Sequence, residues 1–175
     1  MTGTDVMGHL LPEDAIVSDE GNTAGAYAAR ATAGAPLTTG CASPAVPSVR
    51  ACPRHRRGHG VPRTRVIALQ ADGSAMYSPQ SLWTMARERL DVTTLLLNNR
   101  SYAVLNMELD RVGATAGGPR AKAMLDLSDP ELDMVALASA MGVPADRATT
   151  CEELAAQLAA SLDTPGPTLI DRVLP

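Results

Sequence analysis

Short runs of apolar and β-branched residues, separated by polar stretches, mark the candidate strands of this chain. The run over residues 66–69 is apolar on both faces, which is typical of a central strand in a parallel sheet. Runs rich in strand-forming residues also occur over 15–17, 92–97 and 168–173. We therefore predict four buried strands.

Apolar residues at helical spacing lie between these strands. They predict a helix over about 79–90, with Ser78 as its cap and Pro79 at its first position. Capping-box sequences at 128–131 and 150–153 predict two more helix starts. We expect the first of these helices to end at Met141 and the second to cover residues 154–162. Two further helices are expected, an alanine-rich one after residue 23 and one over 102–111. Because strands and helices alternate, we predict an α/β fold with a mainly parallel, doubly wound sheet and helices on both faces.

The length of 175 residues is that of one ordinary domain. We expect residues 1–10 to be a tail and residues 11–175 to form a single domain. The segment over 37–64 is atypical, because it is rich in proline and arginine and has neither helical nor strand periodicity. We expect no regular element there.

Composition narrows the class of protein. Hydrophobic residues make up 45% and charged residues 19%, which excludes a highly charged disordered chain. No apolar run approaches the roughly 20 residues of a membrane helix. The net charge of -4 argues against general affinity for nucleic acid. Three cysteines at irregular spacing and a start without an export signal favour a cytoplasmic protein with reduced thiols.

Polar residues follow two of the predicted strands, and they suggest a ligand site. Asp72 ends one strand and Asn98-Asn99 ends the next, and a crossover brings the carboxyl ends of parallel strands to the same edge of the sheet. Their oxygens suit a Mg²⁺-sized ion, while Gly73 and Ser74 offer an N–H group and a hydroxyl to phosphate. Taken singly, each fragment also suits a simple turn or strand end.

These residues resemble a known motif. Thiamine diphosphate enzymes carry Gly-Asp-Gly followed by Asn-Asn, and Ala71-Asp72-Gly73-Ser74 with Leu97-Asn98-Asn99 is similar to it. The stretch over 71–114 resembles the acetolactate synthase large subunit and benzoylformate decarboxylase group. The sequences SDEGNTAG near the start and GPTLIDRVLP at the end resemble the borders of that group's C-terminal, diphosphate-binding domain. The resemblance covers about residues 11–36 and 65–175.

The resemblance implies a role for each matching residue. The side chains of Asp72 and Asn99 and the backbone carbonyl of Ser101 would hold Mg²⁺. The residues that would contact the diphosphate of thiamine diphosphate are Gly73, Ser74, Tyr102 and, from the loop after the first strand, Asn22 and Thr23.

Two positions depart from the family pattern. Ala71 stands where the family usually has its first glycine. The family also has a glycine-rich stretch between the loop after the first strand and the Asp72 motif, and only Thr39-Gly40-Cys41 resembles its start. The length and composition of 37–64 suggest the hypothesis that this segment is translated in a shifted reading frame.

Segment 37–64 also allows other interpretations. Cys41, Cys52, His55 and His59 could bind zinc, although their spacing matches no zinc module. Three arginines could clamp a nucleic-acid phosphate, namely Arg54, Arg56 and Arg57. We expect an exposed loop instead, because the segment has no apolar periodicity.

The resemblance implies a reaction as well. In the family, the cofactor's thiazolium carbanion attacks a 2-oxo acid and carbon dioxide leaves. The glutamate that activates the ring lies in a separate N-terminal domain, and none of the glutamates considered matches it, namely Glu13, Glu20, Glu88 and Glu108. We therefore expect a homo-oligomer, or a partner chain that supplies the pyrimidine-binding domain. The family consists of lyases and transferases, and we expect this chain to be inactive by itself.

Two alternatives remain open at this point. The chain could be a non-catalytic remnant or binding module of the same fold. A nicotinamide-dinucleotide domain would need Gly-x-Gly-x-x-Gly after the first strand, and Gly21 and Gly25 do not have that spacing.

Overall fold

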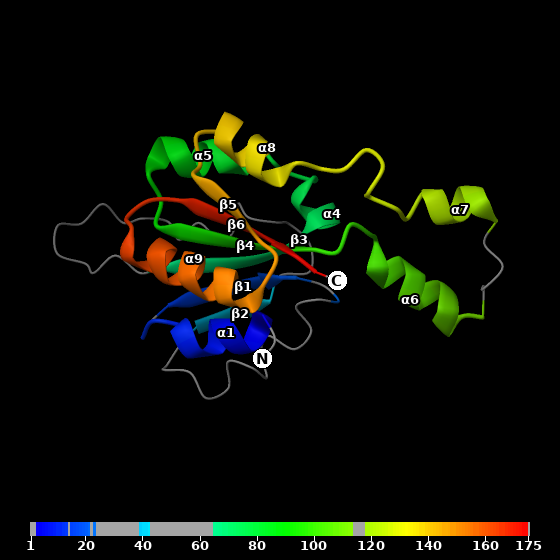
Figure 1. The fold of residues 1–175 in the computed structure, drawn as a ribbon, viewed down its shortest axis with the longest axis horizontal. Coiled ribbons are helices and arrows are strands. Elements are labelled where there is room, and N and C mark those ends of the chain that lie inside the picture. Colours follow the sequence, from blue (N-terminus) through cyan, green and yellow to red (C-terminus); the bar gives the residue numbers. More distant parts are fainter. Residues whose placement is uncertain are drawn as a thin grey trace.

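A parallel sheet with helices on both faces forms the body of the molecule (Figure 1). We describe it from a computed structural model, over residues 3–13, 15–21, 23, 39–42, 65–113 and 118–174. Six strands form the sheet in this part of the chain, and all of the pairings between neighbours are parallel. In spatial order they are β2 (Thr39–Ala42), β1 (Ile16–Glu20), β3 (Val66–Ala71), β4 (Val92–Asn98), β6 (Thr168–Val173) and β5 (Ala145–Ala148).

The four strands predicted from the sequence are confirmed as β1, β3, β4 and β6. The two outer strands were not predicted. β2 lies inside segment 37–64, so the expectation of no regular element is wrong for Thr39–Ala42. β5 carries the exposed pair Asp146 and Arg147 and is the outer strand at the other edge of the sheet, as far as the described residues show. Such short edge strands have no apolar run to reveal them.

Two apolar cores hold the helices to the sheet. The helices are α1 (Gly3–Leu10), α4 (Asp72–Ala75), α5 (Ser81–Glu88), α6 (Ala103–Arg111), α7 (Pro119–Ala123), α8 (Met134–Ala140) and α9 (Cys151–Asp163). On one face, α1 and α9 pack on alternate residues of β1, β3, β4 and β6, among them Ile67 and Leu95. On the other face, α5 and α8 pack on residues such as Val66 and Ala68. The two-layered covering confirms the predicted α/β class.

The start of the chain is part of this core. We expected residues 1–10 to be a tail, but residues 3–10 form α1, which packs against α9. Val6 and Met7 are buried, with exposed fractions of 2% and 0%. So short a helix is stabilised chiefly by such contacts, which the local sequence does not reveal.

Two predicted helix starts are wrong. We expected Ser78 to cap α5, but residues 78–80 form a turn in which the N–H of Ser81 donates to the Ser78 carbonyl, at 3.0 Å, and the helix begins at Ser81. We expected residues 128–131 to open α8, but the Ser128 hydroxyl donates to the Asp126 carboxylate at 2.6 Å. The cap of α8 is Asp133, whose carboxylate accepts from the N–H of Ala136.

The second capping box is confirmed. The Thr150 hydroxyl accepts from the N–H of Glu153 at 3.1 Å, and the Glu153 carboxylate accepts from the N–H of Thr150 at 3.2 Å. Together they satisfy two donors at the start of α9. The alanine-rich helix expected after residue 23 lies outside the described residues. No helix in the described ranges is long and apolar enough to cross a membrane.

We expect Thr150→Ala to lower the free energy of unfolding by about 1 kcal/mol, because the start of α9 loses its side-chain acceptor. Urea titration followed by circular dichroism measures this change. Ser139→Ala, at an exposed position on α8, serves as the control and should change stability by less. Equal stability of wild type and Thr150→Ala would show that the cap contributes nothing.

Candidate functional site

The site lies where β3 and β4 end side by side. The register pairs Ala71 with Leu97, so Asp72 and the loop 98–101 leave the sheet next to each other. Asp72 is only 3% exposed. Its Oδ1 accepts from the N–H of Gly73 at 2.8 Å, and its Oδ2 accepts from the N–H of Arg100 at 2.6 Å. The carboxylate therefore connects the ends of two neighbouring strands.

The loop after β4 has a conformation suited to this contact. Arg100 has a φ of 56°, in the left-handed region that non-glycine residues seldom adopt. Its N–H points at Asp72 and also at the side-chain oxygen of Asn98, at 3.2 Å. The Asn99 oxygen accepts from the N–H of Ser101 at 3.0 Å, which closes a local turn.

Opposing effects act on the pKa of Asp72. Burial raises this pKa, because a charged carboxylate loses its hydration there. The N–H groups of Gly73, Arg100, Ser101 and Asn99 lower it in part, because they stabilise the ionised form. A cation beside this carboxylate would lower the pKa further.

Gly73 lies directly against the ring of Tyr102. A Cβ atom at this position would lie 2.9 Å from the Cδ1 atom of Tyr102, closer still to its Cε1 atom, and 3.3 Å from the Cδ1 atom of Leu127. Only a glycine therefore lets the ring approach the first turn of α4. The ring and the Gly73 backbone form one continuous surface next to Asp72.

A buried glutamine connects this loop to β1. Gln70 is 3% exposed, and its amide donates to the Ser74 hydroxyl at 2.9 Å and to the Glu20 carboxylate at 3.4 Å. The Ser74 hydroxyl in turn donates to the Ala71 carbonyl at 3.1 Å. Burial raises the pKa of Glu20, which is the last residue of β1, while the hydrogen bond from Gln70 lowers it.

Comparison with known proteins identifies the family. The model of the "Thiamine pyrophosphate enzyme, C-terminal TPP binding domain" family matches residues 24–172. The chain belongs to this family. Thiamine pyrophosphate is another name of thiamine diphosphate, so the resemblance seen in the sequence is confirmed.

Several relatives agree with this assignment. "Putative acetolactate synthase large subunit IlvX" of Mycobacterium tuberculosis is 47% identical, over all of this chain and 34% of the relative. Benzoylformate decarboxylase of Pseudomonas aeruginosa is 34% identical, over 63% of this chain and 20% of the relative. The chain thus spans about a third of the length of the first relative.

Solved structures show the same fold. The thiamine diphosphate-dependent 4-hydroxybenzoylformate decarboxylase of Rhodococcus jostii RHA1 superposes with a TM-score of 0.74 at 24% identity. The match covers 97% of this chain and 31% of that protein. Benzoylformate decarboxylase from Polynucleobacter necessarius superposes with a TM-score of 0.73 at 19% identity, over 98% of this chain and 32% of that protein.

The structure brings together most of the residues that the family motif implies. Asp72 is the first residue of α4, and Asn99 and Ser101 lie on the adjoining loop after β4. Thr23 follows the end of β1, which neighbours β3, so it lies toward the same edge of the sheet. Asn22 lies outside the described residues. The others implied for the diphosphate lie within this site, and they are Gly73, Ser74 and Tyr102.

The donor set at this edge is chemically suited to Mg²⁺. It combines one carboxylate with amide and carbonyl oxygens, which are the hard ligands that Mg²⁺ accepts. No cluster of three or more His, Cys, Asp or Glu residues occurs in the described part of the chain.

The backbone tolerates Ala71 at the position where the family usually has glycine. Ala71 has φ -88° and ψ 151°, an extended conformation open to any residue.

The zinc and nucleic-acid interpretations of segment 37–64 rest on residues whose side chains are not among those described. Cys52, His55, His59 and the three arginines fall within undescribed residues, and no side-chain position is described for Cys41.

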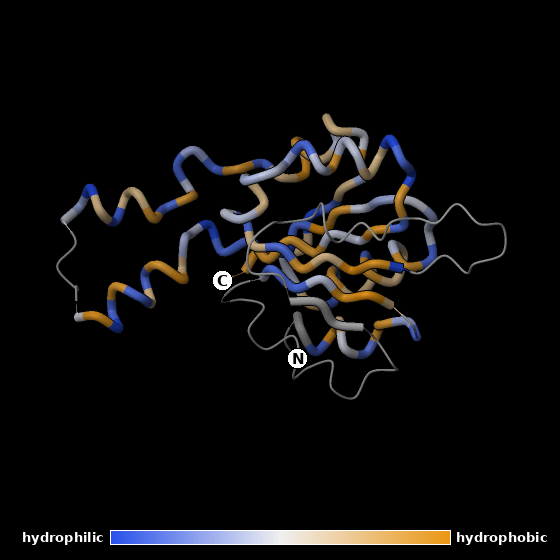
Figure 2. The backbone as a smooth tube through the Cα atoms, turned by 180° about the vertical axis from the view of Figure 1, so that it is seen from behind, coloured by the Kyte–Doolittle hydropathy of each residue, from blue (hydrophilic) through white to orange (hydrophobic). Residues whose placement is uncertain are grey.

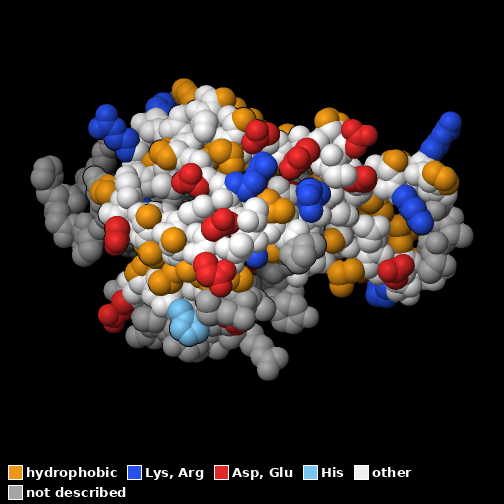
Figure 3. Space-filling view, in the orientation of Figure 1, with side chains coloured by type: hydrophobic (Ala, Val, Ile, Leu, Met, Phe, Trp, Pro, Cys, Tyr) orange, Lys and Arg blue, Asp and Glu red, His pale blue; other side chains and the backbone are white. Residues whose placement is uncertain are grey.

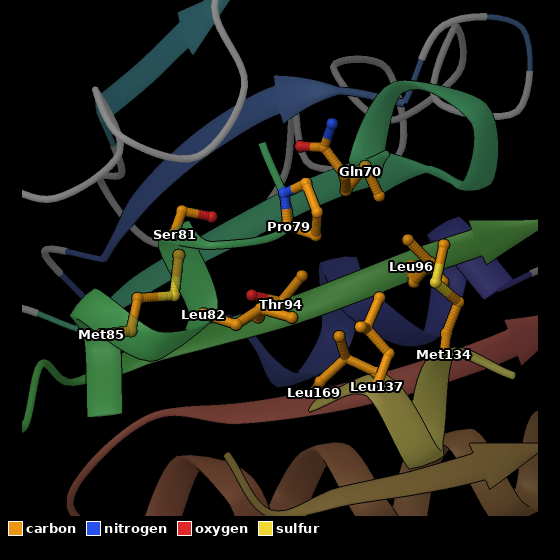
Figure 4. Close-up of a pocket in the computed structure, with 11 residues that line it drawn as sticks. Gln70, Pro79, Ser81, Leu82, Met85, Thr94, Leu96, Met134, Leu137 and Leu169 are labelled. Carbon is orange, nitrogen blue, oxygen red and sulfur yellow. The ribbon is translucent and has the colours of Figure 1, made fainter. Parts of the chain in front are cut away.

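A small cavity near the site is too small for the cofactor. It lies between the sheet and helices α5 and α8, and Gln70, Thr94, Leu96 and Met134 are among its lining residues (Figure 4). Its volume is about 30 Å³, which is room for a water molecule. The Thr94 hydroxyl in its wall is buried and has no hydrogen-bond partner among the described residues. This cavity therefore cannot hold a ligand of the size of thiamine diphosphate.

Two buried polar residues near the site were not among the sequence predictions. These are Gln70 on β3 and Asp171 on β6, which are 3% and 0% exposed. Their signal in the sequence is a polar side chain next to apolar residues of a predicted strand. That signal shows that a partner is needed, but it does not identify the partner.

We expect Gly73→Ala to lower the free energy of unfolding by about 1–3 kcal/mol, because the added methyl group overlaps the Tyr102 ring. In a Tyr102→Ala background the same change should cost less, since the ring is gone. Urea titration of the four proteins measures this difference. Gly118→Ala is the control, because a Cβ atom there meets nothing within 4 Å. Additive effects of Gly73→Ala and Tyr102→Ala would contradict the contact.

Proposed function

We propose that this edge of the sheet binds Mg²⁺ and thiamine diphosphate, and that the chain is the diphosphate-binding part of an enzyme acting on 2-oxo acids. Membership of the family supports the cofactor, and the buried Asp72 beside loop 98–101 supports the metal. The names of the relatives support either an acetolactate synthase or a 2-oxo acid decarboxylase.

In this proposal, the start of α4 and the loop after β4 hold the metal. The side chains of Asp72 and Asn99 and the backbone carbonyl of Ser101 would be its protein ligands. Both oxygens of Asp72 already accept N–H groups, and each has a further lone pair for a cation. Because backbone hydrogen bonds orient the carboxylate, little reorganisation is needed when the ion binds.

The diphosphate would lie on the adjoining surface of α4. The Gly73 backbone, the Ser74 hydroxyl and Tyr102 would face it, with Asn22 and Thr23 approaching from the loop after β1. Gln70 keeps the Ser74 hydroxyl in place through a hydrogen bond of 2.9 Å. When bound, thiamine diphosphate supplies the electron sink for loss of carbon dioxide from a 2-oxo acid. The residues of this chain bind and orient its diphosphate.

The relatives are about three times as long as this chain, and the family supplies the ring-activating glutamate from its pyrimidine-binding domain. We infer that the region described here works together with a pyrimidine-binding domain.

An apolar arm supports this partnership. The arm consists of α6 and α7, which project away from the sheet (Figures 1 and 2), and neither helix has a buried residue. Its exposed apolar side chains are Val104, Leu105, Met107, Val112 and Met124. Apolar side chains gather on this part of the surface in Figure 3. Exposed patches of this kind mark protein interfaces.

We expect Asp72→Ala to abolish Mg²⁺-dependent binding of thiamine diphosphate, because it removes the single carboxylate among the proposed ligands. Isothermal titration calorimetry measures the affinity, and circular dichroism checks the fold. Asp146→Ala is the matched control, since Asp146 is an exposed aspartate on β5. If the Asp72 variant binds as tightly as wild type, the metal assignment is wrong.

We expect the purified 175-residue chain to release no carbon dioxide from pyruvate or benzoylformate, even with saturating thiamine diphosphate and Mg²⁺. Adding a separately expressed pyrimidine-binding domain from a relative should give turnover. Met107→Glu should suppress this turnover, because it places a charge on the apolar arm, while leaving cofactor affinity unchanged.

Arg120→Ala, at an exposed polar position on the same arm, is the control for that substitution. Turnover by the chain alone would contradict the need for a partner. Cofactor binding without turnover in any mixture would favour a non-catalytic binding module.

A further inference from the structure

A fully buried carboxylate lies one strand away from the proposed metal site. Asp171 on β6 is 0% exposed. Its Oδ1 accepts from the side-chain amide of Asn98 at 3.0 Å, and its Oδ2 accepts from Nε of Arg147 at 3.0 Å. Both oxygens are thus engaged by donors from neighbouring strands.

The three side chains lie in a row across the sheet. The register pairs Arg147 on β5 with Asp171 on β6, and pairs Asp171 with Leu96 on β4. Asn98 is two residues beyond Leu96, so its side chain lies on the same face. The row therefore extends from the outer strand β5 to the end of β4.

The row continues into the loop that holds Asp72. The Asn98 oxygen accepts from the N–H of Arg100 at 3.2 Å, and the same N–H donates to Asp72 at 2.6 Å. A connected series of hydrogen bonds thus runs from Arg147 through Asp171 and Asn98 to Arg100. It ends at the proposed metal ligand.

The chemistry of the carboxylate fixes the direction of this series. A carboxylate accepts hydrogen bonds only, so the Asn98 side chain must turn its NH₂ group toward Asp171. Its oxygen then faces the N–H of Arg100. If Asp171 were an amide, one of its two contacts would set a donor against a donor.

Arg147 provides the counter-charge for the buried carboxylate. Its guanidinium also lies 3.8 Å from a Glu131 oxygen and 3.6 Å from an Asp133 oxygen, and both of these carboxylates are exposed. The contact with Asp171 is the shortest of the three and the one with a buried partner. A buried carboxylate without such a partner would be strongly destabilising.

We propose that Asp171, held by Arg147, is a positioning residue for the metal-binding loop: it orients Asn98, which directs the N–H of Arg100 toward Asp72. This inference rests on the proposed binding of Mg²⁺ and thiamine diphosphate. Loss of such outer partners of a metal site typically costs about 10–100-fold in affinity.

The test compares wild type with Asp171→Asn. We expect the variant to bind Mg²⁺ and thiamine diphosphate about tenfold more weakly or worse in calorimetric titration. In the cofactor-free protein, hydrogen exchange of the Arg100 N–H, followed by NMR, should be faster than in wild type. Ser161→Ala is the control for lost stability, because Ser161 makes a buried hydrogen bond to Thr93, near the opposite end of β4. It should change neither measurement.

A double variant tests the direction of the hydrogen bonds. In Asn98→Asp with Asp171→Asn, the amide at 171 can donate to residue 98 and accept from Arg147, so the series is complete again. We expect it to recover the slow exchange at Arg100. Exchange is the readout here, because the carboxylate at residue 98 adds a negative charge beside Asp72 and so changes Mg²⁺ affinity by itself.

The outcomes separate this inference from the proposed function. Wild-type affinity and exchange in Asp171→Asn, or the same losses in Ser161→Ala, would overturn the positioning role. Failure of wild type to bind the cofactor would overturn the proposed function, and the exchange of the Arg100 N–H would then decide the positioning role by itself. Should Asp171→Asn not fold, the double variant decides: recovery supports the proposal, and no recovery overturns it.

Discussion

The hydrogen bond between the Asp72 carboxylate and the N–H of Arg100 is the contact on which the proposed site depends. It joins the end of β3 to the loop after β4 at 2.6 Å, and it requires the left-handed conformation of Arg100. Burial of the carboxylate is unfavourable by itself, and four backbone N–H groups offset part of that cost. The arrangement holds a negative charge ready in a position where a cation would stabilise it.

The sheet provides the rigidity that this contact needs. β3 and β4 lie at the centre of six parallel strands, and separate apolar cores cover the two faces. The proposed site residues directly follow the carboxyl ends of β3 and β4, so buried strands fix their positions. Hydrogen bonds through Asp171 connect the loop after β4 to Arg147 on β5. In our proposal, the outer strand β5 therefore helps to position that loop.

The described part of the chain consists of a body, in which apolar side chains are buried, and an arm, in which they are exposed. Buried side chains fill both faces of the sheet, whereas α6 and α7 carry exposed apolar residues and bury none. Because α6 follows loop 98–101 directly, a partner seated on the arm would lie beside the proposed cofactor site. This agrees with relatives that are about three times as long.

The sequence by itself determined the central strands, the capping box of α9 and the Asp72 to Asn99 motif, because these features depend on residues close together in the chain. It did not reveal α1, β2 or β5, because α1 is stabilised by packing against α9 and the two strands by pairing with neighbouring strands, rather than by local pattern. It placed the starts of α5 and α8 wrongly, because Ser78 and Ser128 make other contacts in the folded chain. Asp171 showed only as a polar residue in an apolar strand. Tertiary structure alone decided that it meets Asn98 and Arg147, because pairing between β4, β6 and β5 joins segments far apart in sequence.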